Sequence, residues 1–315
     1  MRANNSKVRQ YPLEKSPLYG LSNKRKLESM IGLDKYSLNK ISRHITYNNF
    51  TISKKDGGER PVTAPNPYLK RIQRSAYNLM SRIERPDWLI SGSKGKCYID
   101  NAKYHQNNQS QYALTLDIKN FYPNCTRKYV FGFLFDIMKM TNDVAGVLAD
   151  VLTYNFEIPI GSPTSQLLAY FAYEKMFDEL NSLAFKHGCV FTVYVDDLAF
   201  SSQTPFNNKA LINDVAFVLK KYGHSMKRQK KKYYSKEDSK LFTGVVLDTD
   251  NQLKVPNNLH LKIKDDRKQL DDIGEMSKAE KDKFKKRFHG RIISARNIDI
   301  TEYSELVKAA KAISI

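Results

Sequence analysis

Two adjacent carboxylates between two short apolar runs constrain the fold of this chain more than any other feature. Asp196 and Asp197 follow the run 189–193 and precede the run 198–201. Both runs are rich in β-branched and aromatic residues, which predicts a β-hairpin with the two acids at its turn. Like charges this close repel each other unless positive charge lies beside them. Taken alone, a solvated Asp-Asp turn is the commoner arrangement.

A third acid in a similar setting favours a functional interpretation of this pair. Asp117 ends the apolar run 112–116, and the aromatic residues Phe121 and Tyr122 follow it. Three carboxylates that converge from strand ends form an oxygen-rich site suited to Mg²⁺. Two such ions can hold the attacking and leaving oxygens of a phosphoryl transfer. The three acids are therefore the predicted catalytic residues.

The charge of the chain is distributed unevenly along its 315 residues. The net charge of +19 indicates a polyanionic partner, because Lys and Arg gain affinity by displacing counterions from phosphates. Residues 1–116 carry 21 Lys and Arg against 8 Asp and Glu, and residues 221–315 carry 23 against 14. Residues 117–220 carry only 8 against 11. This pattern fits a metal-dependent centre between two arms that bind nucleic acid.

The remaining composition predicts a cytoplasmic protein with no membrane partner. The cysteines at 97, 125 and 189 lie far apart without paired spacing, so neither a disulfide framework nor a zinc site is expected. The first seven residues lack the apolar segment of a signal peptide, and no stretch is long enough to cross a membrane.

The basic N-terminal part of the chain combines a predicted hairpin with a predicted helix. Residues 47–63 flank a turn that contains Gly57 and Gly58, which favours a hairpin. Apolar residues from Leu69 to Ile83 recur at helical spacing after Pro67. That helix also carries four cations that face either solvent or phosphate, namely Lys70, Arg71, Arg74 and Arg82, of which the first three are expected to bind nucleic acid.

A loop that leads into a helix is predicted just before the acid hairpin. Gly161 permits an unusual backbone and the close approach of a ligand. Ser162 can cap a helix that begins at Pro163 and ends near Gly188. Further along, residues 241–247 predict one strand, and the chain from about Pro256 predicts charged helices.

The order of these elements over residues 47–246 resembles that of a reverse transcriptase. By this resemblance Asp117, Ile118, Asp196 and Asp197 are the metal-binding positions, and Tyr122 is the aromatic that selects deoxynucleotides. Gly161 and Ser162 match the loop along the template and the incoming nucleotide. The triphosphate would be held by one or more of Lys54, Lys55 and Arg60 in the hairpin, together with Lys230 in the basic run 227–232.

Two further motifs resemble those of bacterial retron reverse transcriptases. Asn101, Ala102 and His105 match the Asn-Ala-x-x-His signature, whose plain alternative is a loop with a helix-capping Asn. Phe242, Thr243 and Gly244 stand where retron enzymes carry Val-Thr-Gly. The sequence departs from the family pattern at several positions, which are Ile160, Ser162, Gln166, Val195 and Lys227.

The resemblance implies an α+β right-hand polymerase with fingers, an RRM-like antiparallel palm and a helical thumb. The expected parts are a basic helical N-terminal region (1–46), fingers (47–116), palm (117–250) and thumb (251–315). Thumb residues expected to bind nucleic acid are Lys285, Lys286, Arg287 and Arg291.

The cofactor and partners follow from the same resemblance. Two Mg²⁺ ions, with Mn²⁺ as a substitute, would serve as cofactor. Partners would be dNTPs, a cognate non-coding RNA that supplies template and 2′-OH primer, its branched single-stranded DNA product, and an effector protein in trans in antiphage defence.

Three alternatives remain at this level. The chain could be a nucleic-acid scaffold that performs no synthesis, although no metal acid is lost. It could be a nuclease or nucleotidyl cyclase on a related palm, against which Tyr122 and Gly161 argue. It could also be a defence-associated or diversity-generating reverse transcriptase that makes no branched product.

Overall fold

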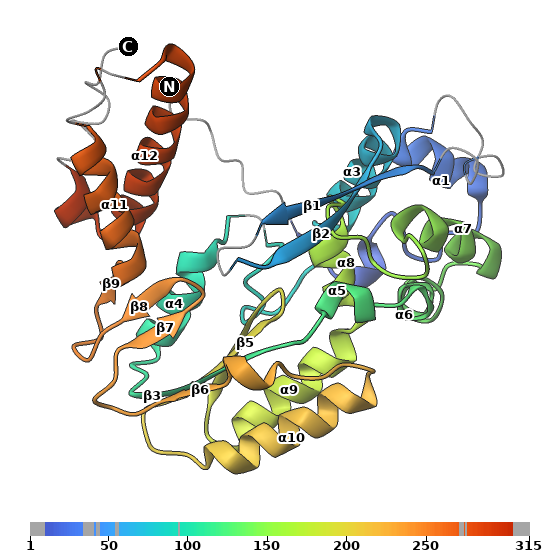
Figure 1. Ribbon diagram of the computed structural model, residues 1–315. Helices are drawn as coiled ribbons and strands as arrows, with labels where there is room; N and C mark the ends of the chain where they lie inside the picture. The colour runs from blue at the N-terminus through green and yellow to red at the C-terminus, as the bar shows by residue number, and fades with distance from the viewer. Residues whose placement is uncertain are drawn as a thin grey trace.

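A computed structural model describes residues 10–33, 41, 45–53, 57–93, 95–270, 274 and 276–304 of the chain (Figure 1). Its centre is an antiparallel sheet in the order β4-β5-β3-β6. The strands are β3 (Tyr112–Asp117), β4 (Val190–Tyr194), β5 (Asp197–Ser202) and β6 (Lys232–Tyr234). Helices connect β3 to β4 and β5 to β6, and β3 and β5 occupy the middle of the sheet. This is the strand order of an RRM-like palm, so the expected α+β fold class is confirmed.

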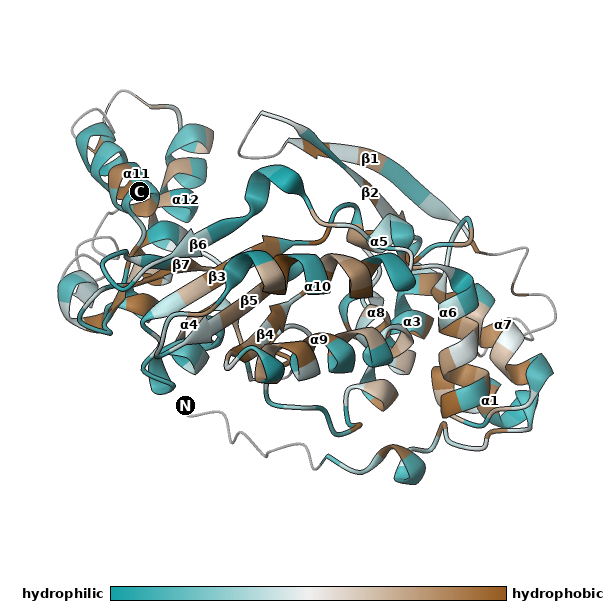
Figure 2. Cartoon of the chain, turned by 90° about the horizontal axis from the view of Figure 1, so that it is seen from below, coloured by the Kyte–Doolittle hydropathy of each residue, from teal (hydrophilic) through white to brown (hydrophobic). Residues whose placement is uncertain are grey.

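Helices cover both faces of the palm sheet. α9 (Glu174–Lys186) and α10 (Asn208–Lys221) pack on one face and lie in front of the sheet in Figure 2. Alternate strand residues such as Phe191 and Phe200 join their apolar side chains in the main core. On the opposite face, α4 (Tyr98–Asn107) packs against β4 and also contacts a second sheet formed by β7, β8 and β9.

The fingers consist of a projecting hairpin and a helical base. β1 (Tyr47–Ser53) pairs with β2 (Glu59–Pro65), which confirms the predicted hairpin. α3 (Pro67–Met80) begins at the Asn66 cap, with Pro67 at its first position as predicted. The further helices before and after β3 are α1 (Lys24–Ile31), α5 (Phe121–Asn124), α6 (Arg127–Gly132), α7 (Asn142–Leu152) and α8 (Ser165–Ala172).

The thumb has a small core of its own. α11 (Asn257–Gln269) and α12 (Lys278–Ile298) pack against each other through buried residues that include Phe284, Phe288 and Ile292. Ser277 and Glu280 form a capping box that fixes the start of α12. The helices follow the strands β7 (Lys240–Phe242), β8 (Val245–Leu247) and β9 (Leu253–Lys254).

Two predicted elements were wrong in detail. Residues 241–247 form not one strand but the tight hairpin β7–β8, because Thr243 (φ 45°) and Gly244 (φ 85°) take the left-handed conformation of a two-residue turn. The helix predicted from Pro163 begins only at Ser165, after the cap residue Thr164. It is also interrupted at Tyr173, which separates α8 from α9.

The predicted boundaries between the parts of the chain also need correction. The division between fingers and palm at residue 117 cuts through β3, which pairs with β5 and β6 along its length and so belongs to the palm. The division between palm and thumb at residue 251 precedes β9, which pairs with β8. The thumb helices themselves begin at Asn257.

Candidate active site

The register of the palm sheet brings the three predicted acids to one edge. Asp117 lies directly opposite Asp197 in the antiparallel pair of β3 and β5. The backbone N–H of Ile118 donates to the carbonyl of Asp196 at 2.9 Å, which holds the hairpin turn against the end of β3. Asp117 is 3% exposed, whereas Asp196 and Asp197 are half-buried. The sequence therefore predicted the convergence of these acids correctly.

The turn that carries Asp196 has a strained backbone. Val195 precedes Asp196 in the turn and has φ 61°, a conformation that β-branched residues rarely adopt. Its N–H donates to the hydroxyl of Ser91 at 2.9 Å, and Ser91 is itself buried. The surrounding structure thus holds a turn that Val195 by itself would disfavour, as is common where a backbone positions functional groups.

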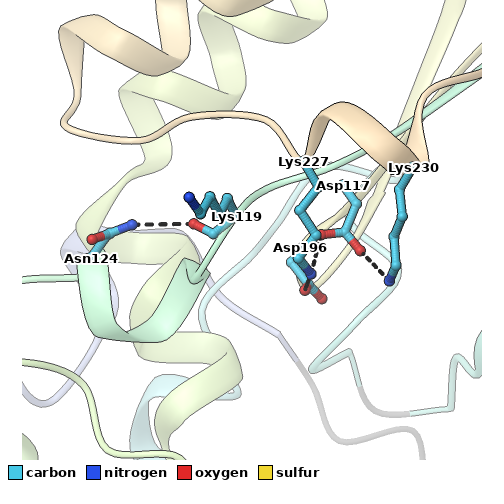
Figure 3. A network of polar contacts seen from close by, with 6 residues as sticks. All are labelled: Asp117, Lys119, Asn124, Asp196, Lys227 and Lys230. Carbon is cyan, nitrogen blue, oxygen red and sulfur yellow. Dashed lines mark hydrogen bonds and ion pairs between the residues drawn. The ribbon is translucent and has the colours of Figure 1, made fainter. Parts of the chain in front are cut away.

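Two lysines from the loop after α10 lie on the Asp117 carboxylate (Figure 3). The Lys227 ammonium is 2.5 Å from Asp117 Oδ1 and 3.9 Å from Asp196 Oδ2. The Lys230 ammonium donates to Asp117 Oδ2 at 2.7 Å. The Lys227 ammonium lies close to Oδ1 but is not oriented to donate a hydrogen bond to it. Oδ1 is therefore a buried carboxylate oxygen that has a positive charge beside it but accepts no hydrogen bond within the described part of the chain.

Burial and mutual repulsion raise the proton affinity of the two turn carboxylates. The pKa of Asp197 is raised to about 6, chiefly by burial and further by the charges of Asp196 and Asp117. The pKa of Asp196 is also raised by burial and by Asp117. The pKa of Lys230 is raised because its ammonium donates a hydrogen bond to Asp117. Closely spaced carboxylates with these shifts are typical of sites that gain stability by binding cations.

The acids fit the metal ions that the resemblance implies. Two lysine ammonium groups occupy positions beside Asp117 that metal ions could take, and its Oδ1 is a buried acceptor that receives no hydrogen bond from the described residues. Carboxylate oxygens are the ligands that Mg²⁺ prefers. Among the described residues, however, no three His, Cys, Asp or Glu side chains already have metal-binding geometry. Side-chain rotation and displacement of the ammonium groups would therefore accompany metal binding.

A basic pocket of about 1230 Å³ lies between the finger hairpin and the palm. Five cationic residues line it, namely Arg60, Lys119, Lys227, Arg228 and Lys230. Arg60 and Lys230, both expected to hold a triphosphate, are thus brought together beside the acids. Lys54 and Lys55, expected to share this role, lie outside the described residues. The pocket has the charge and the location to receive a polyphosphate.

Tyr122 lies close to the acids, but the loop at Gly161 has a mainly structural setting. The pKa of Tyr122 is raised by burial and by the negative charge of Asp196, which places its ring at the site.

Gly161 has φ 124°, and a Cβ there would lie 3.1 Å from the carbonyl of Thr63 in β2. The close approach predicted at Gly161 is therefore made by the protein's own hairpin.

The hydroxyl of Ser162 is likewise used within the fold. It donates to Gln73 Oε1 at 2.8 Å, and the residue is 9% exposed. The same loop is tied to β2, where the Thr63 N–H donates to the Ile160 carbonyl at 2.7 Å. Neither Gly161 nor Ser162 lines the basic pocket. Their expected contact with the nucleotide stays a prediction.

The chain matches the family model "Reverse transcriptase (RNA-dependent DNA polymerase)" over residues 52–247. The chain belongs to the reverse transcriptase family. The match begins near the end of β1 and includes β2 of the finger hairpin, all three acids and the β7–β8 turn, which are among the elements on which the resemblance in sequence depended.

Similar proteins with curated descriptions are retron reverse transcriptases. The Retron Se72 reverse transcriptase of Salmonella heidelberg (strain 579083-10) is 27% identical over 191 residues, covering 58% of this chain and 49% of that protein. The Retron Ec86 reverse transcriptase of Escherichia coli is 27% identical over 161 residues, covering 50% and 49%. The matches thus span about half the length of these relatives. The resemblance to bacterial retron reverse transcriptases is confirmed.

A solved structure supports the fold. Telomerase from Candida albicans, in complex with a fragment of telomeric RNA, aligns with a TM-score of 0.50 and 11% identity, covering 93% of this chain and 69% of that chain. The fold of this reverse transcriptase family member is therefore the right-hand polymerase fold. No helix within its described ranges has both the length and the apolar character needed to cross a membrane.

The two retron-type motifs of this reverse transcriptase meet in space. Asn101, Ala102 and His105 lie buried in the interior of α4, not in the loop considered as the alternative. The His105 ring stacks on Phe242 with centroids 4.2 Å apart and planes at 10°. Asn101 donates a hydrogen bond to the hydroxyl of Thr243 at 2.6 Å. Sequence spacing gave no sign of this contact, since the motifs are more than a hundred residues apart.

A second basic groove, of about 990 Å³, runs from the β7–β8 turn to the thumb. Thr243 and Gly244 line it together with the expected thumb residues Lys286, Arg287 and Arg291. Arg287 and Arg291 also form ion pairs at 2.9 and 2.7 Å with Asp266, which is 1% exposed. Their charges are thus partly used within the thumb. Lys285 is half-buried and has a partner within the chain, and it does not line the groove.

The expected cations of α3 lie away from the grooves described above. Lys70, Arg71 and Arg74 are exposed on this helix. The guanidinium groups of Arg71 and Arg74 lie 5.3 and 5.4 Å from the ring centroids of Tyr68 and Tyr77. None of the three lines the grooves, so their contact with nucleic acid stays a prediction.

The site also contains residues to which the sequence analysis assigned no role in binding or catalysis. Lys119 and Arg228 line the basic pocket, and Lys227 contacts two of the acids. The dense basic run 227–232 was the available signal for Lys227 and Arg228. For Lys119, the only indication in the sequence was its position two residues after Asp117.

Proposed function

We propose that this protein is an RNA-directed DNA polymerase of the retron type. The observation that carries the proposal is the register of Asp117 opposite Asp197, with Asp196 at the turn and a basic pocket alongside. Strand register fixes two carboxylates on one edge, and the positive charge of the pocket beside them supports binding of a nucleoside triphosphate there. Membership in the reverse transcriptase family supports this chemistry.

The chain's own residues have distinct tasks in such a reaction. Asp117 and Asp196, with Asp197 as the third acid, would hold Mg²⁺, which when bound lowers the pKa of the primer hydroxyl and neutralises phosphate charge. Arg60, Lys119 and Lys230 would orient the triphosphate from the basic pocket. Preorganised cations of this kind stabilise developing phosphate charge without reorganisation. The half-buried Tyr122 ring would exclude a 2′-hydroxyl beside Asp196.

The template and product that we propose are those of a retron. A cognate structured non-coding RNA would provide the template and a 2′-OH primer, and the product would be a branched single-stranded DNA. The confirmed resemblance to retron reverse transcriptases and the contact between the two retron-type motifs support this. An effector protein in trans and a role in antiphage defence belong to the same proposal.

Primer extension on a defined template tests the polymerase. The purified chain, supplied with Mg²⁺, a primed RNA template and labelled dNTPs, is expected to extend the primer. D196N should lower the rate at least a hundredfold, because it removes a carboxylate that would bind the metal ion. D250N, at an exposed site in the β8–β9 turn, is the matched control and should keep the wild-type rate. Cleavage or cyclisation without extension would contradict the proposal.

Isolation of the nucleic acid that co-purifies with the protein tests the retron assignment. A branched RNA–DNA molecule should lose its junction on treatment with a debranching enzyme that cleaves 2′,5′ linkages. Linear DNA in its place would favour a defence-associated or diversity-generating reverse transcriptase. Full biological activity of D196N would instead favour a scaffold that performs no synthesis.

A further inference from the structure

A series of buried hydrogen bonds connects the palm sheet with the β7–β8 turn. It links six side chains from five parts of the fold, in the order Ser110, Ser201, His105, Thr192, Asn101 and Thr243. The first five are at most 5% exposed. Buried polar groups of this kind need partners, and each partner restricts which atom donates.

The donors and acceptors of this series can be assigned from its own geometry. Thr192 donates its only hydroxyl proton to Asn101 Oδ1 at 2.5 Å. In its 2.8 Å contact with His105 Nε2 it must therefore accept. Burial lowers the pKa of His105 to about 3, so the ring is neutral and carries one proton, on Nε2. Nδ1 then accepts from Ser201, 2.6 Å away.

The series ends at a hydroxyl that faces the groove. Asn101 Nδ2 donates to Thr243 Oγ1 at 2.6 Å, so the Thr243 proton points elsewhere. Thr243 is half-buried, and no acceptor for that proton occurs within the described ranges of the chain. The residue lines a groove of about 510 Å³ that also includes Asp117 and Asp197. The free end of the series therefore lies on the same groove as two of the three acids.

The backbone at this end is held against its preference. Thr243 has φ 45°, which is costly for a β-branched residue and is found mainly where the surroundings impose it. The Asn101 hydrogen bond and the stacking of Phe242 on His105 supply that restraint. On β5, Ser201 and Asp197 share one face of the sheet, about 13 Å apart along the strand. The hydrogen-bond series that restrains Thr243 thus includes a residue of β5, the strand that also carries Asp197.

We propose that this series fixes the Thr243 hydroxyl as a hydrogen-bond donor to a phosphate oxygen of the nucleic acid in the groove. Asn101 and His105 are positioning residues that act through Thr243. A phosphate oxygen only accepts hydrogen bonds, so the direction of the series matches it, and Lys232 in the same groove adds positive charge. The nature of the ligand rests on the proposed function, whereas the direction of the series does not.

The tautomer of His105 tests the direction of the series without any activity. In the full chain labelled with ¹⁵N-histidine, the H105Q variant identifies the signals of His105. We expect the tautomer protonated on Nε2, with Nδ1 as acceptor. Protonation on Nδ1 would reverse every bond in the series and turn the Thr243 proton inward, which would overturn the proposal.

Binding of a fluorescein-labelled DNA primer annealed to an RNA template tests the ligand. T243V keeps the shape and β-branching of the side chain but removes the hydroxyl, and it should raise Kd about tenfold, as expected for a hydrogen bond to a charged group. T243S keeps the hydroxyl and should stay within about twofold of wild type. T204V, in the loop after β5, is the matched control and should not change Kd. Equal Kd values for T243V and T243S would overturn the proposal.

Primers with single methylphosphonate substitutions separate a direct contact from a structural effect. At one position the substitution should weaken binding to wild type but not to T243V, because the two changes remove the same interaction. Equal weakening of both proteins at every position would contradict the contact. If the wild type binds the duplex but fails to extend it, the proposed function fails, while the tautomer and the Kd comparison still decide this inference.

Discussion

Acid should destabilise the folded chain through His105, and the size of the effect can be worked out from the structure. The ring is fully buried between α4 and the palm strands, and burial lowers its pKa to about 3. An exposed histidine in the unfolded chain has a pKa of about 6.5. Because the unfolded chain binds the proton more readily, acidification between these two values favours unfolding.

For this pair of pKa values, the free energy of unfolding should fall by about 1.3 kcal/mol between pH 7.0 and pH 5.5. By pH 4.5 the loss should reach about 2.5 kcal/mol. Urea denaturation followed by circular dichroism at each pH measures the effect. H105Q is the comparison, since an amide can accept from Ser201 and donate to Thr192 but does not titrate.

H105Q should be less stable at pH 7 because it loses the stacking on Phe242, which is worth about 1 kcal/mol. The free energy of unfolding of H105Q should approach that of wild type as the pH falls, and at lower pH it should exceed it. His224, whose pKa burial lowers to about 4, titrates in both proteins and cancels from the comparison. Parallel stability curves for wild type and H105Q would refute this reasoning.

Three further perturbations have expected outcomes. K227M removes the ammonium 2.5 Å from Asp117 Oδ1, so the nucleotide-free chain should bind Mn²⁺ about twofold to fivefold more tightly, as measured by electron paramagnetic resonance. Unchanged affinity would contradict the idea that Lys227 competes with the metal ion for the acids. D266N removes the charge that pairs with two thumb arginines, so opening of α11 and α12 should cost about 2 kcal/mol less, and hydrogen exchange should accelerate there but not in α9. G161A should destabilise the chain by about 1–3 kcal/mol in thermal unfolding, because its Cβ would lie 3.1 Å from the carbonyl of Thr63 and its φ is 124°. G146A, in α7 with open space around it, should not lower stability, and equal losses in the two glycine variants would argue against strain at residue 161.

The edge that carries the three acids could be predicted from the sequence because its signals are local. Asp117 ends one apolar strand, Asp197 begins another and Asp196 lies in the turn before it, and antiparallel pairing then brings these positions together. The finger hairpin and α3 were predictable for the same reason, since a Gly-Gly turn and a Pro at the first helical position act within a few residues. The palm topology came from the family resemblance.

Contacts between distant segments could not be predicted in this way. The hydrogen bond between Asn101 and Thr243 depends on how α4 packs between two sheets, which no local pattern encodes. The turn at Thr243 was missed because a β-branched residue ordinarily favours a strand, and tertiary restraint overrode that preference. The ion pairs of Arg287 and Arg291 were missed because a charged helix looks the same in sequence whether its charges face solvent or a buried Asp266.

The separate core of the thumb has a consequence for how the molecule could handle substrates of different width. The buried residues of α11 and α12 belong to a cluster that shares no member with the main core. The contacts that tie these helices to the rest of the chain include a hydrogen bond between the hydroxyls of Tyr98 and Ser294 and the packing of Ile298. A swing of the helix pair near Pro256 would leave the main core untouched, but it would disturb the packing of Ile298 and the contact of Val255 with the thumb core. The angle between thumb and palm is therefore not fixed by an apolar core common to the thumb and the main core.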